Sequence, residues 1–324
     1  MPDPPAVRRL GRSGLAVSVV GLGTNNFGMK LDLGQCRAVV DAALDHGITL
    51  IDTSDSYGAS EERLGELLRG RRDDVVIATK FGSDVRRRGQ DNGADWDARG
   101  SRRYVRRAVE ASLRRLRTEW IDLYQLHFPD PATPIEETLS ALDDLVHEGK
   151  VRYVGHSNLA GWQVAHAEWV ARTEHLTRFV SAQNEYNLLR RRAEAELVPA
   201  LRQYGIGLLP YFPLASGLLT GKYRRGEGAP EGSRVRDWGM EAVLTDATFD
   251  RLEAIERFAA ERGLAMLDVA IGGLAAQPAV ASVIAGATTP EQVAANVRAG
   301  AWRPTAEDLA ELDRVVRETP RADR

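Results

Sequence analysis

The sequence is organised around the stretch Leu50-Ile51-Asp52-Thr53-Ser54-Asp55-Ser56-Tyr57-Gly58. A short apolar run ends here in an acid, and a tyrosine follows five residues later on a turn rich in serine and glycine. The apolar run predicts a buried β-strand that carries Asp52 at its C-terminal end. The turn is expected to lift Tyr57 over the same opening, so that a carboxylate and a phenol lie close together.

Seven further apolar runs resemble this strand, and a helical pattern follows each of the eight. The runs cover residues 19–24, 48–52, 75–79, 121–126, 151–155, 179–183, 207–211 and 281–285. The helical patterns cover residues 34–46, 61–70, 102–117, 134–147, 161–174, 193–204, 266–276 and 290–299. The runs lack strict alternation, as expected for parallel strands that helices cover. Eight such units predict an α/β fold, a (β/α)₈ TIM barrel.

The remaining segments fit around this barrel. Residues 7–17 predict an N-terminal β-hairpin, and two extra helices are expected at residues 248–262 and 305–318. The alternative fold, a doubly wound open sheet, needs a Gly-x-Gly-x-x-Gly turn after its first strand. The segment Gly21-Leu22-Gly23-Thr24-Asn25-Asn26 lacks the third glycine. No shift in composition marks a boundary, so we expect residues 1–324 to form a single domain.

Composition narrows the classes of partner. The chain has 324 residues, 43% of them hydrophobic, and a net charge of −3 with acids and bases interspersed. We therefore expect neither nucleic acid nor a membrane as the main partner. The segment Met1–Pro5 has no features of a signal peptide, and the single Cys36 cannot form an internal disulfide. These features predict a cytoplasmic protein that acts on a small molecule, as a monomer or a homo-oligomer.

Two connections are longer than a compact barrel needs, at residues 82–100 and 213–246. Both follow strands, so both are expected on the face where active sites of such barrels lie. Trp96 and Trp238 predict that the loops pack against other parts of the protein, because solvated segments rarely contain tryptophan.

Four polar residues stand at or just after the C-terminal ends of the second, third and fourth strands: Asp52, Tyr57, Lys80 and His127. A lysine ammonium near a phenol favours the phenolate and is expected to lower the pKa of Tyr57. Asp52 would keep Lys80 charged, and His127 would orient an oxygen that accepts the proton from Tyr57. None of these side chains supplies a hydride, so reductive chemistry here requires a cofactor.

These residues and their spacing resemble the aldo-keto reductase family over nearly the whole chain. Residues 52–58 are similar to its signature D-T-A-x-x-Y-G, and residues 9–18 look like its N-terminal hairpin. Residues 126–131 look like the branch that includes bacterial reductases and potassium-channel β subunits. The resemblance implies that Asp52, Tyr57, Lys80 and His127 are the catalytic tetrad. It also implies that NADP(H) is the cofactor and that an aldehyde or ketone, or the alcohol, is the substrate.

The same resemblance implies the cofactor site. Ser157, Asn158 and Gln183 would hold the nicotinamide carboxamide, and Tyr211 would stack on the ring. The segment after Tyr211 would cover the pyrophosphate, with the residues Phe212, Pro213, Leu214, Ala215, Ser216, Gly217 and Leu218. Four more residues would complete this part of the cofactor site. They are Gly23, Thr24 and Asn25 at the end of the first strand and Asp52 at the end of the second.

A second cofactor segment would hold the adenosine phosphate and adenine. It comprises Gly286, Thr288, Gln292 and Asn296. Residues 286–289 precede a helix N-terminus, whose free N–H groups favour an anion. Lys222 and Arg234 would add positive charge, which favours NADP(H) over NAD(H).

Several alternatives stay open at the level of sequence. The chain could be a regulatory module that binds NADP(H) as channel β subunits do, or a barrel hydrolase without a cofactor. His156 stands where family members often have a small apolar residue. It could shape the pocket beside the carboxamide, but we expect it to pack inside the barrel as a satisfied histidine. Asp55 is expected to form a turn, and Asp130 to cap a loop. The charge run 86–88 is expected to be solvated. The histidines show no metal-ligand spacing, so we predict no metal site.

Overall fold

Eight parallel strands form the centre of the computed structural model, which describes residues 6–318. They are β3 (Val20–Gly23), β4 (Leu50–Asp52), β5 (Val76–Phe81), β6 (Ile121–Leu126), β7 (Val151–Ser157), β8 (Ser181–Gln183), β9 (Gly207–Leu208) and β10 (Val283–Gly286). Their order in the sheet is β10-β3-β4-β5-β6-β7-β8-β9. A parallel bridge between Leu208 and Val280 closes the ring, and the Ala281 N–H donates to the Leu208 carbonyl at 2.9 Å. The (β/α)₈ barrel is therefore confirmed.

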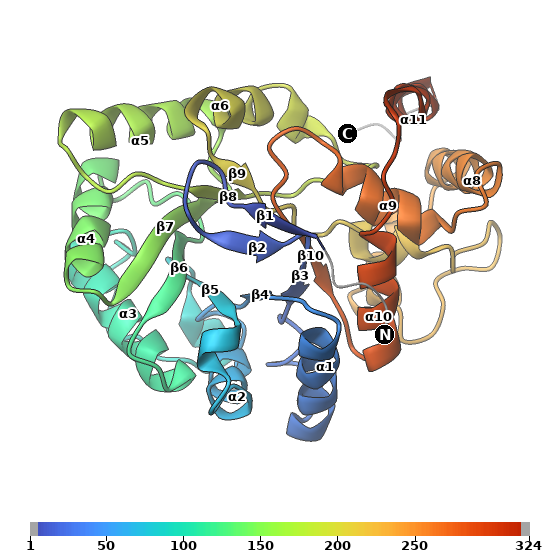
Figure 1. Cartoon of the computed structure of the whole chain (residues 1–324). Coiled ribbons are helices and arrows are strands. Elements are labelled where there is room, and N and C mark those ends of the chain that lie inside the picture. Colours follow the sequence, from blue (N-terminus) through green and yellow to red (C-terminus); the bar gives the residue numbers. More distant parts are fainter. Residues whose placement is uncertain (1–5, 319–324) are drawn as a thin grey trace.

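The helices surround this barrel in sequence order (Figure 1). They are α1 (Leu33–Asp45), α2 (Ser60–Leu67), α3 (Arg102–Leu116), α4 (Ile135–His147), α5 (Gly161–Thr173), α6 (Leu197–Tyr204), α9 (Met266–Ala275) and α10 (Pro290–Ala299). Local chemistry sets their ends. For example, Asp32 and Gln35 form a capping box at the start of α1, and Gly47, with φ of 75°, follows its end.

The two extra helices are also present, as α8 (Asp246–Ala260) and α11 (Ala306–Glu318). They pack together outside the ring, over a separate apolar cluster that includes Phe249, Ile255 and Leu312. This cluster also receives the 3₁₀ segment η4 (Ala215–Thr220). The extra helices thereby support the loop that follows β9.

The N-terminal hairpin closes one end of the barrel. Strands β1 (Val7–Arg9) and β2 (Ala16–Ser18) pair antiparallel and lie across the strands in Figure 1. Leu10 and Val17 are fully buried in the cluster that fills the barrel interior. Gly11, with φ of 57°, allows the turn to approach Gly205, where a Cβ would lie 2.5 Å from the carbonyl oxygen. The opposite end, where the strands carry their C-terminal residues, stays available for a site.

The two long loops are ordered by specific contacts. In the first, η2 (Val85–Arg88) is followed by Asp95, whose carboxylate accepts from Arg86 at 3.1 Å and from Arg99 at 2.8 Å. In the second, α7 (Arg234–Asp237) forms one short turn. The expectation that the tryptophans pack into the protein is wrong for Trp96, which is 71% exposed, and holds only in part for Trp238, which is 48% exposed. Each ring lies under an arginine, Arg103 at 3.6 Å and Arg234 at 4.8 Å from the ring centroid.

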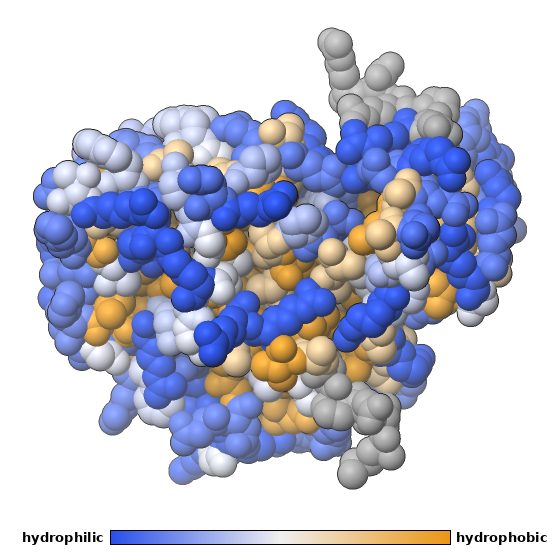
Figure 2. All heavy atoms as spheres, turned by 45° about the horizontal axis from the view of Figure 1, so that its top comes forward, coloured by the Kyte–Doolittle hydropathy of each residue, from blue (hydrophilic) through white to orange (hydrophobic). Residues whose placement is uncertain are grey.

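Hydrophilic side chains cover most of the face in Figure 2, with smaller apolar areas between them. Within residues 6–318, no helix combines the length and the apolar character that crossing a bilayer requires. Met1–Pro5, from which we expect no signal peptide, lie outside the described residues, as do the side chains of Arg87 and Arg88 in the predicted solvated run. The exposed Arg86 agrees with that expectation.

The close approach of α2 and α3 provides a test of the packing. A Cβ on Gly65 would lie 2.3 Å from the Arg115 carbonyl oxygen and 2.7 Å from the Leu116 carbonyl carbon. Gly65→Ala should therefore lower the free energy of unfolding by about 1–3 kcal/mol, measured by urea denaturation. The control is Gly34→Ala on the exposed start of α1, which should leave stability unchanged or slightly raised. Equal stability of the two variants would contradict the packing argument.

Candidate active site

A fully buried lysine lies at the centre of the site. Lys80 is on β5, next to β4, and its ammonium donates to both Asp52 carboxylate oxygens at 2.7 and 2.8 Å and to the Thr53 carbonyl at 2.8 Å. Burial alone would lower the pKa of Lys80, but Asp52 and Tyr57 outweigh it and hold the pKa above its usual value. Lys80 therefore stays charged at neutral pH.

Tyr57 lies beside this ammonium, with Lys80 Nζ 5.0 Å from its ring centroid. The expected lowering of its pKa is wrong as a net effect. Burial raises the pKa of Tyr57, and Asp52 adds to the rise, while Lys80 offsets only part of it. The phenol is therefore protonated at neutral pH, as a proton donor must be.

His127 completes the group, directly after β6. Its imidazole is buried and packs edge-on to Tyr57, with ring centroids 5.9 Å apart, and stacks on Phe128 at 4.7 Å. Burial, and then the charge of Lys80, lower the pKa of His127 well below its usual value. The ring is therefore neutral and can donate from only one of its two nitrogens.

The residues expected around the nicotinamide carboxamide lie next to this tetrad. Gln183 Nε2 donates to Asp52 Oδ1 at 2.7 Å, and Ser157 Oγ donates to the Gln183 carbonyl at 2.6 Å. Asn158, with φ of 61°, donates to the His127 carbonyl at 2.9 Å and accepts from the Tyr211 hydroxyl at 2.8 Å. One polar network thus joins the ends of β7 and β8, and Tyr211 after β9, to the tetrad.

The loop after Tyr211 has an unusual backbone. Phe212, Ala215 and Ser216 all have positive φ, between 46° and 60°, a conformation that costs energy in residues other than glycine. Pro213, Ala215 and Leu218 are buried, while Leu214, Ser216 and Gly217 are half-buried. The loop therefore anchors its apolar side chains and leaves backbone near the surface.

Positive charge gathers beyond this loop. The Arg234 guanidinium lies over the rings of Phe212 and Trp238, at 5.5 and 4.8 Å. Burial lowers the pKa of Lys222, the charges of Lys30 and Arg234 lower it further, and the charge of Asp237 acts in the opposite direction. Asp237 pairs with Lys30 at 2.8 Å, and among residues 6–318 no carboxylate lies within ion-pairing distance of Lys222 or Arg234, so the positive charge is only partly compensated.

The predicted adenosine segment lies at the end of β10 and the start of α10. Thr289 caps α10, and Gln292 Oε1 accepts from the Thr288 N–H at 2.8 Å. Asn296 Nδ2 donates to the Gly286 carbonyl at 3.5 Å. The side chain of Gln292 thus already occupies one N–H group that we expected to face a phosphate.

The residues predicted near the first strand are closely packed. Gly23 pairs with both Gly286 and Asp52 in the sheet, and Asn25 is half-buried. The Thr24 hydroxyl is fully buried and donates to the Asp52 carbonyl at 2.8 Å. In this structure, therefore, the Thr24 hydroxyl supports Asp52.

Of three expectations about single residues, one needs correction. Asp55 lies in a turn as expected, which the Tyr57 N–H closes by donating to the Ser54 carbonyl at 3.1 Å. Its side chain is also fully buried, accepting from Asn92 Nδ2 at 2.8 Å and from Ser54 Oγ at 3.2 Å. His156 is buried, but it packs against Phe179 between barrel and helices, and neither ring nitrogen has a partner among the described residues. Asp130 caps its loop as expected, accepting from the Gly100 N–H at 2.6 Å.

Sequence reasoning also missed a buried polar network behind the tetrad. Arg115 donates to Glu61 at 2.7 Å and to Asn92 Oδ1 at 3.1 Å, and Thr79 donates to Glu61 at 2.6 Å. Asn92 comes from the loop 82–100, which sequence reasoning left without a structure. The one indication in the sequence was that Asn92 lies on a loop that follows a barrel strand.

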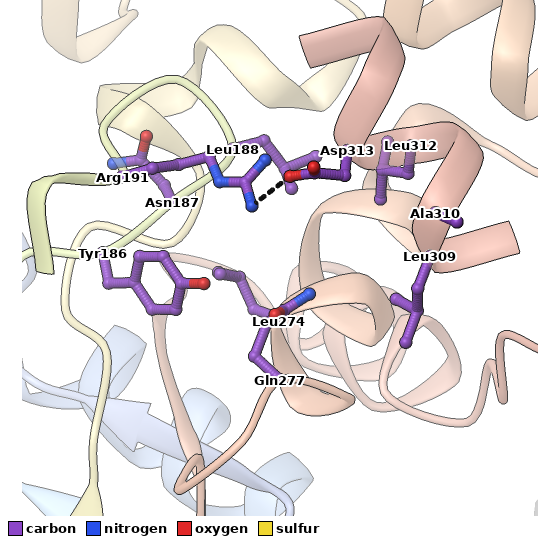
Figure 3. A pocket seen from close by; sticks show the side chains of 10 residues that line it. All are labelled: Tyr186, Asn187, Leu188, Arg191, Leu274, Gln277, Leu309, Ala310, Leu312 and Asp313. Carbon is purple, nitrogen blue, oxygen red and sulfur yellow. Dashed lines mark ion pairs between the residues drawn. The ribbon is translucent and has the colours of Figure 1, made fainter. Parts of the chain in front are cut away.

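A separate pocket of about 220 Å³ lies where the segment after β8 meets α9 and α11 (Figure 3). The Arg191–Asp313 ion pair, at 2.6 Å, spans it. No residue of the tetrad or of the expected cofactor site lines it. No group of three or more His, Cys, Asp or Glu side chains within residues 6–318 is arranged to hold a metal ion.

The buried Asp55 makes stability depend on pH. Burial, and then the charge of Glu61, raise the pKa of Asp55 to about 8. Between about pH 4 and pH 8 the folded state therefore binds more protons than the unfolded state, and Asp55 lowers stability as pH rises. Asp55→Asn removes this term, so its unfolding free energy relative to wild type should increase from about pH 5 to about pH 8 in urea titrations. Asp97→Asn, at a side chain 95% exposed in the loop 82–100, is the control and should show no such trend.

Comparison with known proteins agrees with this geometry. The model of the Aldo/keto reductase family matches residues 19–317. The chain is 36% identical to the uncharacterized oxidoreductase YrpG of Bacillus subtilis (strain 168), over 90% of this chain and 89% of that protein. It is 33% identical to a probable voltage-gated potassium channel subunit beta of Oryza sativa subsp. japonica, over 97% of each chain. It is 34% identical to L-glyceraldehyde 3-phosphate reductase of Escherichia coli (strain K12), over 95% of this chain and 92% of that protein. The chain belongs to the aldo/keto reductase family of oxidoreductases.

Proposed function

We propose that this protein reduces an aldehyde or ketone to the alcohol with NADPH, and that Tyr57 donates the proton. The observation that carries the proposal is the fully buried Lys80, fixed by both oxygens of Asp52 and lying against the Tyr57 phenol. A buried charge costs several kcal/mol unless it is paired, so a structural role alone gives little reason for this arrangement. Its position against a phenol suits stabilisation of a phenolate.

The residues divide the chemistry between them. When bound, the reduced nicotinamide supplies a hydride to the carbonyl carbon. Tyr57 gives its proton to the carbonyl oxygen, and Lys80 stabilises the phenolate that remains. The neutral His127 donates a hydrogen bond to the same oxygen and orients it. Alcohol oxidation follows the same steps in reverse, with the Tyr57 phenolate as base.

The chain's residues fit a phosphorylated dinucleotide. Lys222 and Arg234 form a cationic region with no carboxylate partner among the described residues, as expected where an anion binds. The amide and hydroxyl groups of Ser157, Asn158 and Gln183 lie beside the tetrad, where they would hold a carboxamide. We propose NADP(H) rather than NAD(H), because the extra phosphate would meet this charge.

The second candidate is a regulatory module, favoured by the likeness to a probable potassium channel subunit beta. Such a module would bind the cofactor with little turnover. The intact tetrad favours the enzyme, because a module has no need of a neutral, buried His127 beside Tyr57. Consumption of NADPH with a panel of aldehydes separates the two.

Tyr57→Phe removes the proton donor and keeps the ring. Turnover with 4-nitrobenzaldehyde or methylglyoxal should fall by about 10²–10⁴-fold, while NADPH affinity, read from tryptophan fluorescence quenching, should change little. Tyr204→Phe on α6 is the matched control and should retain full activity. If Tyr57→Phe keeps most of its activity, the proton-donor role is wrong.

Arg234→Ala tests the preference for the phosphorylated cofactor. Removing a charged donor from a phosphate should weaken NADPH binding by about 10- to 100-fold and leave NADH binding nearly unchanged. Arg225→Ala is the control, because Arg225 is paired with Asp246, Asp250 and Glu253. Equal weakening of both cofactors by Arg234→Ala would contradict the assignment.

A further inference from the structure

Three serine hydroxyls surround one nitrogen of the His127 ring. Nδ1 lies 2.9 Å from Ser83 Oγ, 3.1 Å from Ser54 Oγ and 3.5 Å from Ser56 Oγ. Ser54 and Ser56 come from the turn after β4, and Ser83 comes from the first residues of the loop 82–100. The other nitrogen, Nε2, is not part of this cluster.

Counting protons shows which hydroxyl has a proton free for Nδ1. Ser54 Oγ accepts from the Ser56 N–H at 3.2 Å, contacts Ser56 Oγ at 2.9 Å and donates to Asp55 Oδ1 at 3.2 Å. A hydroxyl has one proton and two lone pairs, so these contacts already use the capacity of Ser54. In the described chain, Ser83 Oγ has only one hydrogen-bond partner, which is His127 Nδ1. Its proton is therefore available to Nδ1, and donation by Ser83 would place the ring proton on Nε2.

Hydrogen bonds also connect the loop that carries Ser83 to the barrel. The loop that carries Ser83 also carries Asn92, which is buried and donates to Asp55 Oδ2 at 2.8 Å. Arg115 donates to Asn92 Oδ1 at 3.1 Å. Asp55 in turn accepts from Ser54, which contacts His127. Asn92 thus ties the middle of the loop to the cluster that Ser83 joins near its start. Ser54, moreover, stands where the family signature quoted above has alanine.

We propose that Ser83 is a positioning residue that holds His127 in the tautomer with its proton on Nε2. Ser54 supports it, and Asn92 secures the loop 82–100 through Asp55. The inference rests on the proposed function, because the Nε2 proton matters only if His127 orients a carbonyl oxygen. It assigns the loop a part in catalytic geometry that is separate from any contact with substrate.

The test reads the tautomer directly. The protein is labelled with ¹⁵N-histidine, and the shifts of the two ring nitrogens show which one holds the proton. His127→Gln identifies the signal. Wild type should show Nε2–H with Nδ1 as acceptor, and Ser83→Ala, alone or with Ser54→Ala, should shift the population toward Nδ1–H. A wild-type Nδ1–H form, or populations unchanged in the double variant, would overturn the proposal.

Kinetics supply the second readout. Ser83→Ala should lower kcat for an aldehyde by about tenfold with little change in NADPH affinity, and Ser83→Thr, which keeps the hydroxyl, should restore it. Ser140→Ala on α4, whose hydroxyl bonds Arg102, is the control and should leave both readouts unchanged. Unchanged kcat in Ser83→Ala would also overturn the proposal. If Ser83→Ala shifts the tautomer but the wild-type protein reduces no carbonyl, the proposed function is wrong. The role of Ser83 in fixing the His127 tautomer is then still supported.

Discussion

The Lys80–Asp52 ion pair is the constraint on which the rest of the site depends. Both partners are removed from water, and such a pair persists only when every donor and acceptor is satisfied. Thr53 and Gln183 supply the remaining contacts, from strands that the barrel brings together. The pair fixes a positive charge next to Tyr57, and in the proposed reaction this charge would stabilise the phenolate.

Burial and the charge of Lys80 together set the protonation states of Tyr57 and His127. Burial raises the pKa of Tyr57 and lowers the pKa of His127. The charge of Lys80 opposes the rise at Tyr57 and adds to the fall at His127. The result is a neutral acid beside a neutral donor, both next to a fixed cation. Such preorganised groups need little rearrangement when charge develops on a bound oxygen.

Behind this first layer, a second polar layer joins loop and barrel. Asn92 and Arg115 connect the loop 82–100 to Asp55 and Glu61, and Ser83 reaches His127. Buried polar groups of this kind are stable only as a connected network. Their arrangement accounts for the order of a loop whose sequence is rich in Arg, Asp and Gly.

The sequence by itself determined the barrel, because the spacing of eight apolar runs leaves few alternatives. It also determined which four polar side chains meet at the site, because parallel strands present their C-terminal residues on one face. Only the tertiary structure decided that Asp55 is buried, that His156 lacks partners and that burial outweighs Lys80 in setting the pKa of Tyr57. Gln183 and Asp52, which bond at 2.7 Å, are 131 residues apart in the chain. Desolvation and such contacts depend on atoms from distant segments, and no local pattern of residues encodes them.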